Sequence, residues 1–224
     1  MNIIFDIWNT LYNGEAAMLA GFNKVSNGYA LSCSSRDLLA LYKGIYMKMP
    51  ILYWDIVLGE MKHFEELSKQ IGFYRWETLY ETYHAWVLES LILFPFVKEA
   101  LICLKSDHHD LFILSNGRQI NQEFKLQYWG IKKFFSAIYT SEKIQLEKPN
   151  ILAFSFLLEQ EDLDVKETWM IWDSIDNDII PAENLWIRTL LFNEKKLKDW
   201  FILWKNGFTS YKNLPWMLRS LTKK

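Results

Sequence analysis

Near the start of the chain the sequence reads Ile3-Ile4-Phe5-Asp6-Ile7-Trp8-Asn9-Thr10-Leu11, an apolar run that ends in a carboxylate. The run is typical of a buried strand, and Asp6 stands where that strand gives way to a loop. Open parallel sheets bind their ligands just beyond the carboxyl ends of their strands. A carboxylate in that place is suited to attack a phosphoryl or alkyl centre and form a covalent ester. Taken alone, such a residue is more often a helix N-cap or a turn residue.

Three segments farther along the chain repeat the pattern of an apolar strand followed by polar groups. In the first of them, residues 111–114 run into Ser115-Asn116-Gly117. The serine hydroxyl and the backbone amides of such a glycine turn favour the binding of an anionic oxygen. The sequence therefore predicts an anion-binding turn at this strand end.

The other two segments supply a cation and a group of carboxylates. Lys148-Pro149 follows a strand predicted over residues 138–140 and offers a point charge that can hold a nucleophile and a phosphate together. The strand predicted over residues 168–172 leads into an acidic stretch that contains Asp173, Asp176 and Asp178. Carboxylate oxygens are ligands that Mg²⁺ prefers.

In this order the four segments resemble those of the haloacid dehalogenase-like hydrolase superfamily, and the resemblance covers nearly the whole chain. It implies that Asp6 is the nucleophile and that Lys148 supports it. It also implies a Mg²⁺ cofactor held by Asp6, Asp173 and the main-chain carbonyl group of Trp8, with Asp178 either as a further ligand or as a partner of the ligands. By the same resemblance Ser115 and Lys148 would bind the phosphate, and Thr10, Asn116 and Trp8 would complete the substrate- and phosphate-binding site.

Trp8 is the main departure from that family. Its phosphatases carry a second aspartate two residues after the nucleophile, which protonates the leaving group and then activates water. Tryptophan does neither. Loss of a general acid or base lowers a rate by about 10²- to 10⁴-fold. Tyr12, Glu15 and the residues of the predicted cap are candidates for a replacement, and the sequence does not choose among them.

Trp8 also favours a second interpretation, because the dehalogenases of the superfamily have an aromatic residue at this position and need no metal. Those enzymes have serine in place of the first acidic residue of the fourth motif, whereas this chain keeps Asp173. The acidic stretch therefore favours magnesium and phosphate. Two bulky residues replace glycines that are common in the family, Trp172 and Trp186, and we expect both to fill space in the core.

Helical spacing of apolar residues dominates the chain between the first motif and Pro95. We therefore predict an α/β fold: a Rossmann-like parallel-sheet core formed by residues 1–13 and 95–224, with a helical cap inserted at residues 14–94. Helices expected at residues 97–105, 119–129, 150–160 and 195–205 alternate with the strands, which implies parallel pairing with helices on both faces. The amphipathic stretch from Leu197 to Lys205 is expected to pack on the sheet.

Composition limits the remaining possibilities. The chain has 224 residues, 50% of them hydrophobic, which is enough for one good core plus a modest insert. Its formal charge of −2 gives no general attraction to nucleic acid. No apolar run reaches the length of about 18 residues that a membrane span needs. We expect a cytoplasmic monomer or homodimer that acts on a small-molecule substrate, with no nucleic-acid or membrane partner.

Three functional hypotheses follow from the sequence. The first is a magnesium-dependent phosphatase that forms an aspartyl-phosphate on Asp6 and acts on a small phosphorylated metabolite. The second is a metal-independent 2-haloacid dehalogenase, in which Asp6 attacks carbon. The third is a binding protein that keeps the fold while Trp8 prevents turnover.

Overall fold

The structure is a computed structural model that describes residues 1–49, 56–193 and 207–221. The chain forms two compact units. One, here called the core unit, consists of Met1–Tyr12 and Leu93–Lys224, and the other, here called the helical unit, consists of Asn13–Ile92. All the residues predicted for the functional site belong to the core unit. The role of the helical unit as a cap stays a prediction.

The core unit is built on a parallel five-stranded sheet with the strand order β3-β2-β1-β4-β5. Its strands are β1 (Asn2–Phe5), β2 (Asp110–Ser115), β3 (Ala137–Thr140), β4 (Thr168–Trp172) and β5 (Arg188–Leu191). The predicted α/β class is confirmed. The strands added after β1 lie first on one side of it and then on the other, so β1 stands at the switch point of the sheet. Sheets of this type bind ligands at that point.

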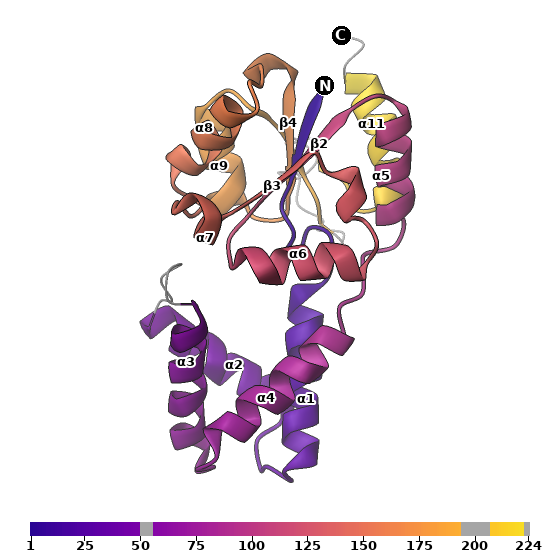
Figure 1. Cartoon of the computed structure of the whole chain (residues 1–224). Helices are drawn as coiled ribbons and strands as arrows, with labels where there is room; N and C mark the ends of the chain where they lie inside the picture. The colour runs from indigo at the N-terminus through magenta and orange to yellow at the C-terminus, as the bar shows by residue number, and fades with distance from the viewer. Residues whose placement is uncertain (50–55, 194–206, 222–224) are drawn as a thin grey trace. The chain divides into compact units, whose positions relative to one another are not determined.

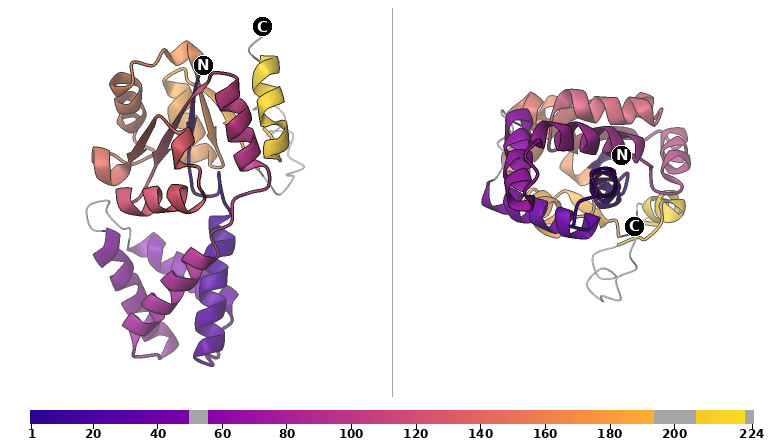
Figure 2. Two further views of the ribbon diagram at one scale, coloured as in Figure 1. Left: turned by 45° about the vertical axis from the view of Figure 1, so that its right-hand side comes forward. Right: turned by 90° about the horizontal axis from the view of Figure 1, so that it is seen from below.

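Helices cover both faces of this sheet. Figures 1 and 2 show α8 and α9 on one side, and α5 and α11 on the other. The helices of the core unit are α5 (Val97–Ser106), α6 (Gln119–Tyr128), α7 (Ser141–Ile144), α8 (Ile151–Gln160), α9 (Ile180–Asn184) and α11 (Leu214–Leu221), with short turns η2 (Lys132–Phe134), η3 (Val165–Glu167), η4 (Ile175–Ile179) and η5 (Tyr211–Asn213). The helices predicted at 97–105, 119–129 and 150–160 are confirmed. The predicted helix at 195–205, with the stretch from Leu197 to Lys205, lies outside the described residues.

The three central strands β1, β2 and β4 each contain a continuous apolar run because both faces of the sheet are covered. All five residues of β4 are buried, and Trp172 packs its ring 5.4 Å from that of Phe154 in α8. Trp172 therefore fills the core as predicted. The same prediction is wrong for Trp186, whose side chain is 85% exposed. Its backbone has a left-handed φ of 62° in the turn before β5, so it lies outside the regular packing of helix and strand.

The helical unit contains α1 (Gly14–Gly28), α2 (Ser35–Lys48), α3 (Ile56–Ile71) and α4 (Trp76–Glu89). Its core is aromatic, with the rings of Phe22, Tyr42, Phe64 and Tyr83 packed together. Gly21 lets α1 approach α4 closely, because a Cβ atom there would lie 2.8 Å from side-chain atoms of Tyr83 and Val87. No helix in the described parts of the chain is both long enough and apolar enough to cross a bilayer.

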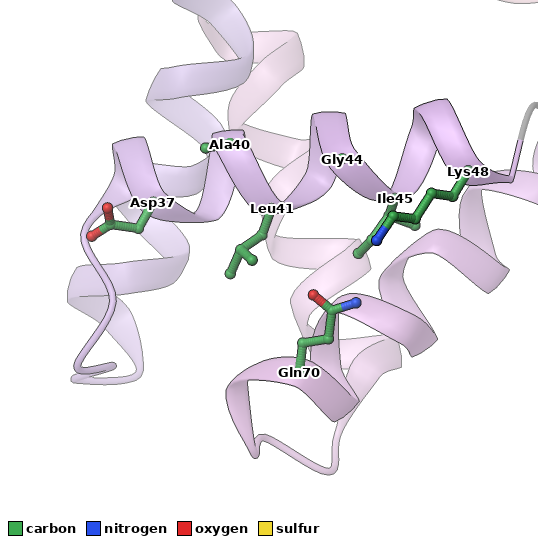
Figure 3. A pocket seen from close by; sticks show the side chains of 7 residues that line it. All are labelled: Asp37, Ala40, Leu41, Gly44, Ile45, Lys48 and Gln70. Carbon is green, nitrogen blue, oxygen red and sulfur yellow. The ribbon is translucent and has the colours of Figure 1, made fainter.

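A shallow groove of about 440 Å³ lies on the helical unit. It is lined by residues of α2 between Asp37 and Lys48 and by Gln70 of α3 (Figure 3). The groove contains none of the residues that the four sequence motifs predict for the functional site. It is therefore not evidence for the position of the substrate.

Candidate functional site

The sheet brings the four motifs together at one edge. Phe5 of β1 is aligned with Ile113 of β2 and with Ile171 of β4. Asp6 follows one residue after this level, while Ser115 and Asp173 each follow two residues after it. The backbone amide of Asp6 donates a hydrogen bond to the carbonyl oxygen of Ile171 at 3.2 Å, which fixes the start of the loop. The side chains predicted from separate motifs therefore gather beyond the carboxyl ends of neighbouring strands.

Lys148 is the centre of this group of charges. Its Nζ atom lies 2.8 Å from Oδ1 of Asp6 and 2.9 Å from Oδ1 of Asp178, and all three side chains are at least 93% buried. Burial alone would lower the pKa of Lys148, but the charges of Asp178 and Asp6 outweigh it and raise the pKa above its ordinary value. Lys148 therefore stays charged. Its ammonium group also lies 4.5 Å from the centre of the Trp172 ring, a cation–π contact.

The turn after β2 fixes the backbone of Lys148. The side chain of Asn116 accepts a hydrogen bond from the amide of Lys148 and donates one to its carbonyl oxygen, each at 2.9 Å. The N–H group of Gly117 donates to Oγ of Ser141 at 2.9 Å, and the anion-binding role predicted for the turn amides stays a prediction. Phosphate binding by Ser115 and Asn116 stays a prediction.

The acidic stretch after β4 divides into inward and outward side chains. Asp178 is 4% exposed, whereas Asp176 belongs to the exposed residues. Asp173 accepts a hydrogen bond from the hydroxyl group of Thr10 at 3.4 Å. Burial, and then the nearby charge of Asp6, raise the pKa of Asp173 to about 6. Burial also raises the pKa of Asp178, although the charge of Lys148 opposes the shift.

The donor set fits magnesium by charge and by chemistry. Among the described residues, Asp6 and Asp178 are both paired with the ammonium group of Lys148, and Asp173 lies within the electrostatic influence of Asp6 and Lys148. The three carboxylates therefore carry more negative charge than this one lysine offsets. A hard divalent cation is the natural partner of such oxygen donors. Throughout the ranges that the structure describes, no group of three or more histidine, cysteine, aspartate or glutamate side chains is arranged so that it could hold a metal ion, so the fit to magnesium is one of charge and donor chemistry and not of arrangement. The carboxylates of Asp6 and Asp178 instead form ion pairs with Lys148.

Trp8 lies at the border of this cluster, with 37% of its surface exposed. Its ring meets that of Tyr12 edge to face, with the centres 5.6 Å apart at an angle of 83°. The hydroxyl group of Tyr12 is buried and has no hydrogen-bond partner among the described residues. Burial, and then the charge of Asp6, raise the pKa of Tyr12 well above its usual range. Trp8 and Tyr12 thus form an aromatic pair near Asp6.

Two supporting residues were not found by sequence reasoning. Tyr211 in η5 donates a hydrogen bond to the carbonyl oxygen of Thr10 at 2.7 Å, and Gln122 in α6 donates one to the carbonyl oxygen of Asn116 at 2.7 Å. Each side chain holds a loop that carries a predicted site residue. Nothing in the sequence distinguishes Tyr211 from ten other tyrosines. Gln122 lies five residues after Gly117, in the first turn of α6. This closeness in sequence to the second motif was the one sign that Gln122 could support the site.

We predict that Lys148→Met destabilises the metal-free protein by about 3 to 5 kcal/mol, because it leaves Asp6 and Asp178 buried without their counter-charge. Urea unfolding near pH 7 measures the effect. Lys69→Met is the matched control, since it removes an exposed ion pair with Glu65 and should change stability little. A Lys148→Met protein as stable as the wild type would contradict the assignment of Lys148 as the counter-charge of both carboxylates.

Comparison with known proteins agrees with this arrangement. The family model described as "Haloacid dehalogenase-like hydrolase" matches residues 3–192. A glyceraldehyde 3-phosphate phosphatase of Methanothermobacter thermautotrophicus is 29% identical over 198 residues, which are 86% of this chain and 85% of that protein. The magnesium-bound HAD-hydrolase YfnB of Bacillus subtilis has a similar fold, with a TM-score of 0.77 and 21% identity over 97% of both chains. So has a 2-haloacid dehalogenase of Pseudomonas syringae, with a TM-score of 0.68 and 17% identity over 98% of both chains.

Proposed function

Because the chain belongs to the haloacid dehalogenase-like hydrolase family, we propose that it is a phosphatase that transfers the phosphoryl group of a small phosphorylated compound to Asp6. The observation that supports the proposal most is the buried contact of Lys148 with Asp6 at 2.8 Å. A carboxylate held by a fixed cation at the switch point of a parallel sheet can attack phosphorus, and the same cation can bind the phosphoryl oxygens. The phosphatase names among its relatives support the same reaction.

The reaction proceeds in two steps. In the first, a carboxylate oxygen of Asp6 forms a bond with phosphorus, the bond between phosphorus and the leaving oxygen breaks, and an acyl phosphate results. In the second, water attacks phosphorus, which releases inorganic phosphate and restores the carboxylate. Lys148 orients Asp6 in both steps, and Ser115 binds a phosphoryl oxygen.

Magnesium is part of the proposal. Asp6, Asp173, Asp178 and the carbonyl oxygen of Trp8 would hold the ion. When bound, it would offset the negative charge of the phosphoryl group and of the carboxylates around it. The raised pKa values of Asp173 and Asp178 support the proposal, because burial disfavours the charged form of each carboxylate and the charge of Asp6 adds to this effect, which a bound cation would offset.

A metal-independent dehalogenase is the second candidate. Trp8 favours it, since an aromatic residue at this position is a feature of that branch, and the structure gives Trp8 an aromatic partner in Tyr12. Asp173 weighs against it, because a buried carboxylate beside Asp6 would repel the carboxylate of a haloacid. The fold itself does not distinguish the two, since it resembles members of both branches.

The experiment that separates them is a magnesium titration by calorimetry. We predict that Mg²⁺ binds, that Asp173→Ala weakens binding by more than the roughly 10- to 100-fold typical of groups that only orient a ligand, and that affinity increases as pH rises through 6. The pH dependence follows because ligation requires the charged carboxylate and the pKa of Asp173 is about 6. Asp176→Ala, which changes an exposed carboxylate in the same stretch, should leave binding unchanged. A wild-type protein that binds no Mg²⁺ at pH 8 would contradict the phosphatase proposal.

A further inference from the structure

Trp8 replaces the family's second aspartate, so the side chain at position 8 cannot donate a proton to the leaving group. As Asp6 takes the phosphoryl group, an electron pair stays on the leaving oxygen and negative charge develops there. In this family a carboxyl group at position 8 would donate a proton to that oxygen and so neutralise the charge. The structure places a different group beside Trp8.

Lys125 of α6 lies against the ring of Trp8. Its Nζ atom is 5.9 Å from the centre of the Trp8 ring and 5.4 Å from the centre of the Tyr12 ring. Cations at such distances from an aromatic face are attracted to it. Because the two rings also pack edge to face on each other, the ammonium group belongs to one cluster with the residue that replaces the acid.

The opposite side of Lys125 is tied to the second motif. Its Nζ atom donates a hydrogen bond to Oε1 of Gln122 at 3.1 Å. Gln122 in turn donates to the carbonyl oxygen of Asn116 at 2.7 Å and to Oγ of Ser115 at 3.4 Å. Lys125 is therefore held between position 8 and the turn predicted to bind phosphate. In Figures 1 and 2, α6 lies at the end of the core unit toward which β1 runs, which is the end that carries Asp6.

The two other candidates named from the sequence fit less well. Burial and the charge of Asp6 raise the pKa of Tyr12, which makes its hydroxyl group a weaker acid. Glu15 lies in the helical unit and is paired with Lys43. A negatively charged Glu15 would repel a leaving oxygen that is gaining negative charge. Lys125 has the opposite sign of charge and lies in the core unit with the nucleophile.

We propose that Lys125 stabilises the leaving group in the reaction of Asp6, so that a fixed positive charge replaces the missing carboxyl group at position 8. This inference rests on the proposed phosphatase function. The bond between phosphorus and the leaving oxygen breaks as the bond to Asp6 forms. The electron pair remains on the leaving oxygen next to the ammonium group, and that oxygen then takes a proton from water.

The test compares leaving groups. A preorganised positive group aimed at developing charge contributes about 10²- to 10³-fold to kcat. We expect Lys125→Met to lower kcat by that factor for an alkyl phosphate such as glycerol phosphate. The loss for 4-nitrophenyl phosphate should be much smaller, because nitrophenolate carries its own charge well. Lys125→Arg keeps the charge and should restore most of the alkyl phosphate activity.

The matched control is Lys132→Met, which removes another partly exposed lysine of the core unit that is paired with Glu123. It should leave both activities unchanged. An equal loss on both substrates in Lys125→Met, without rescue by arginine, would show a packing role and overturn the proposal. A rise in KM confined to substrates with a second anionic group would show a binding subsite and would also overturn it.

Failure of the phosphatase function and failure of the proposed role of Lys125 give different experimental results. A wild-type protein that hydrolyses neither phosphate in the presence of Mg²⁺ would remove the proposed phosphatase function itself. A wild-type protein that hydrolyses both phosphates, with the Lys125→Met variant equal to it on both, would leave the phosphatase in place and remove only the role of Lys125. Circular dichroism of each variant confirms that it is folded before its rates are compared.

Discussion

Asp6→Asn is expected to abolish phosphate hydrolysis, with a loss on the order of 10⁶-fold, the size observed when a covalent nucleophile is removed from an enzyme. The amide nitrogen and oxygen are far poorer nucleophiles than a carboxylate. The variant should still fold, because Lys148 keeps its contact with Asp178 at 2.9 Å. It also loses one of the negative charges that raise the pKa values of Asp173 and Asp178.

Steady-state hydrolysis of 4-nitrophenyl phosphate measures this effect. The matched control is Asp176→Asn, an exposed carboxylate in the acidic stretch, which should keep wild-type activity. Urea unfolding of Asp6→Asn shows whether lost activity comes from lost structure. A pure, folded Asp6→Asn protein that still turns over substrate would remove Asp6 from its role.

Trp8→Asp is expected to raise the hydrolysis of phosphates with poor leaving groups by about 10²- to 10⁴-fold, the contribution typical of a general acid. Reactive aryl phosphates should gain much less, because their leaving groups need little protonation. Trp8 is 37% exposed, so the introduced carboxyl group keeps partial contact with water and the fold should tolerate it. Trp8→Asn, which has a similar size and no proton to transfer, is the control and should give no gain.

The same substitution separates the three functional hypotheses. A dehalogenase would lose chloride release in Trp8→Asp and gain no phosphatase activity. A binding protein would remain inactive in both forms while it keeps its fold and its magnesium site. The proposed role of Lys125 adds a further expectation. Once the carboxyl group is restored, Lys125→Met should lower the rate less than it does in the wild type, because both groups serve the same oxygen.

The strands and the place of the site were predictable because each motif joins a buried apolar run to polar groups. Residues 111–114 and 169–172 are apolar throughout, which identifies strands covered on both faces. In a parallel sheet the carboxyl ends of neighbouring strands lie at the same edge. The proximity of Asp6, Ser115 and Asp173 therefore follows from the alternation of strands and helices along the chain. The acidic stretch was less predictable, since the inward position of Asp178 and the outward position of Asp176 depend on the turn η4.

The contacts that refine the site come from tertiary packing, which leaves little trace in a single sequence. Lys125 contacts Trp8 and Tyr12 only because the fold brings α6 close to the loop that follows β1. The sequence of α6 shows no more than that Gln122, its hydrogen-bond partner, lies three residues before Lys125. Asn116 was predicted to bind phosphate, yet its side chain also holds the backbone of Lys148. Trp186 is exposed because its backbone adopts a left-handed conformation, which the surrounding sequence does not predict.

The role of Asp6 as the nucleophile is tested most directly by detection of the phosphoryl group on its side chain. The wild-type protein is mixed with Mg²⁺ and 4-nitrophenyl phosphate, quenched in acid within the first turnovers, and its peptides are examined by mass spectrometry. We predict one added phosphoryl group on the peptide that contains Asp6, and its absence in Asp6→Asn. Continued release of phosphate by a protein whose Asp6 peptide never carries that group, under a quench that preserves an acyl phosphate standard, would contradict the account.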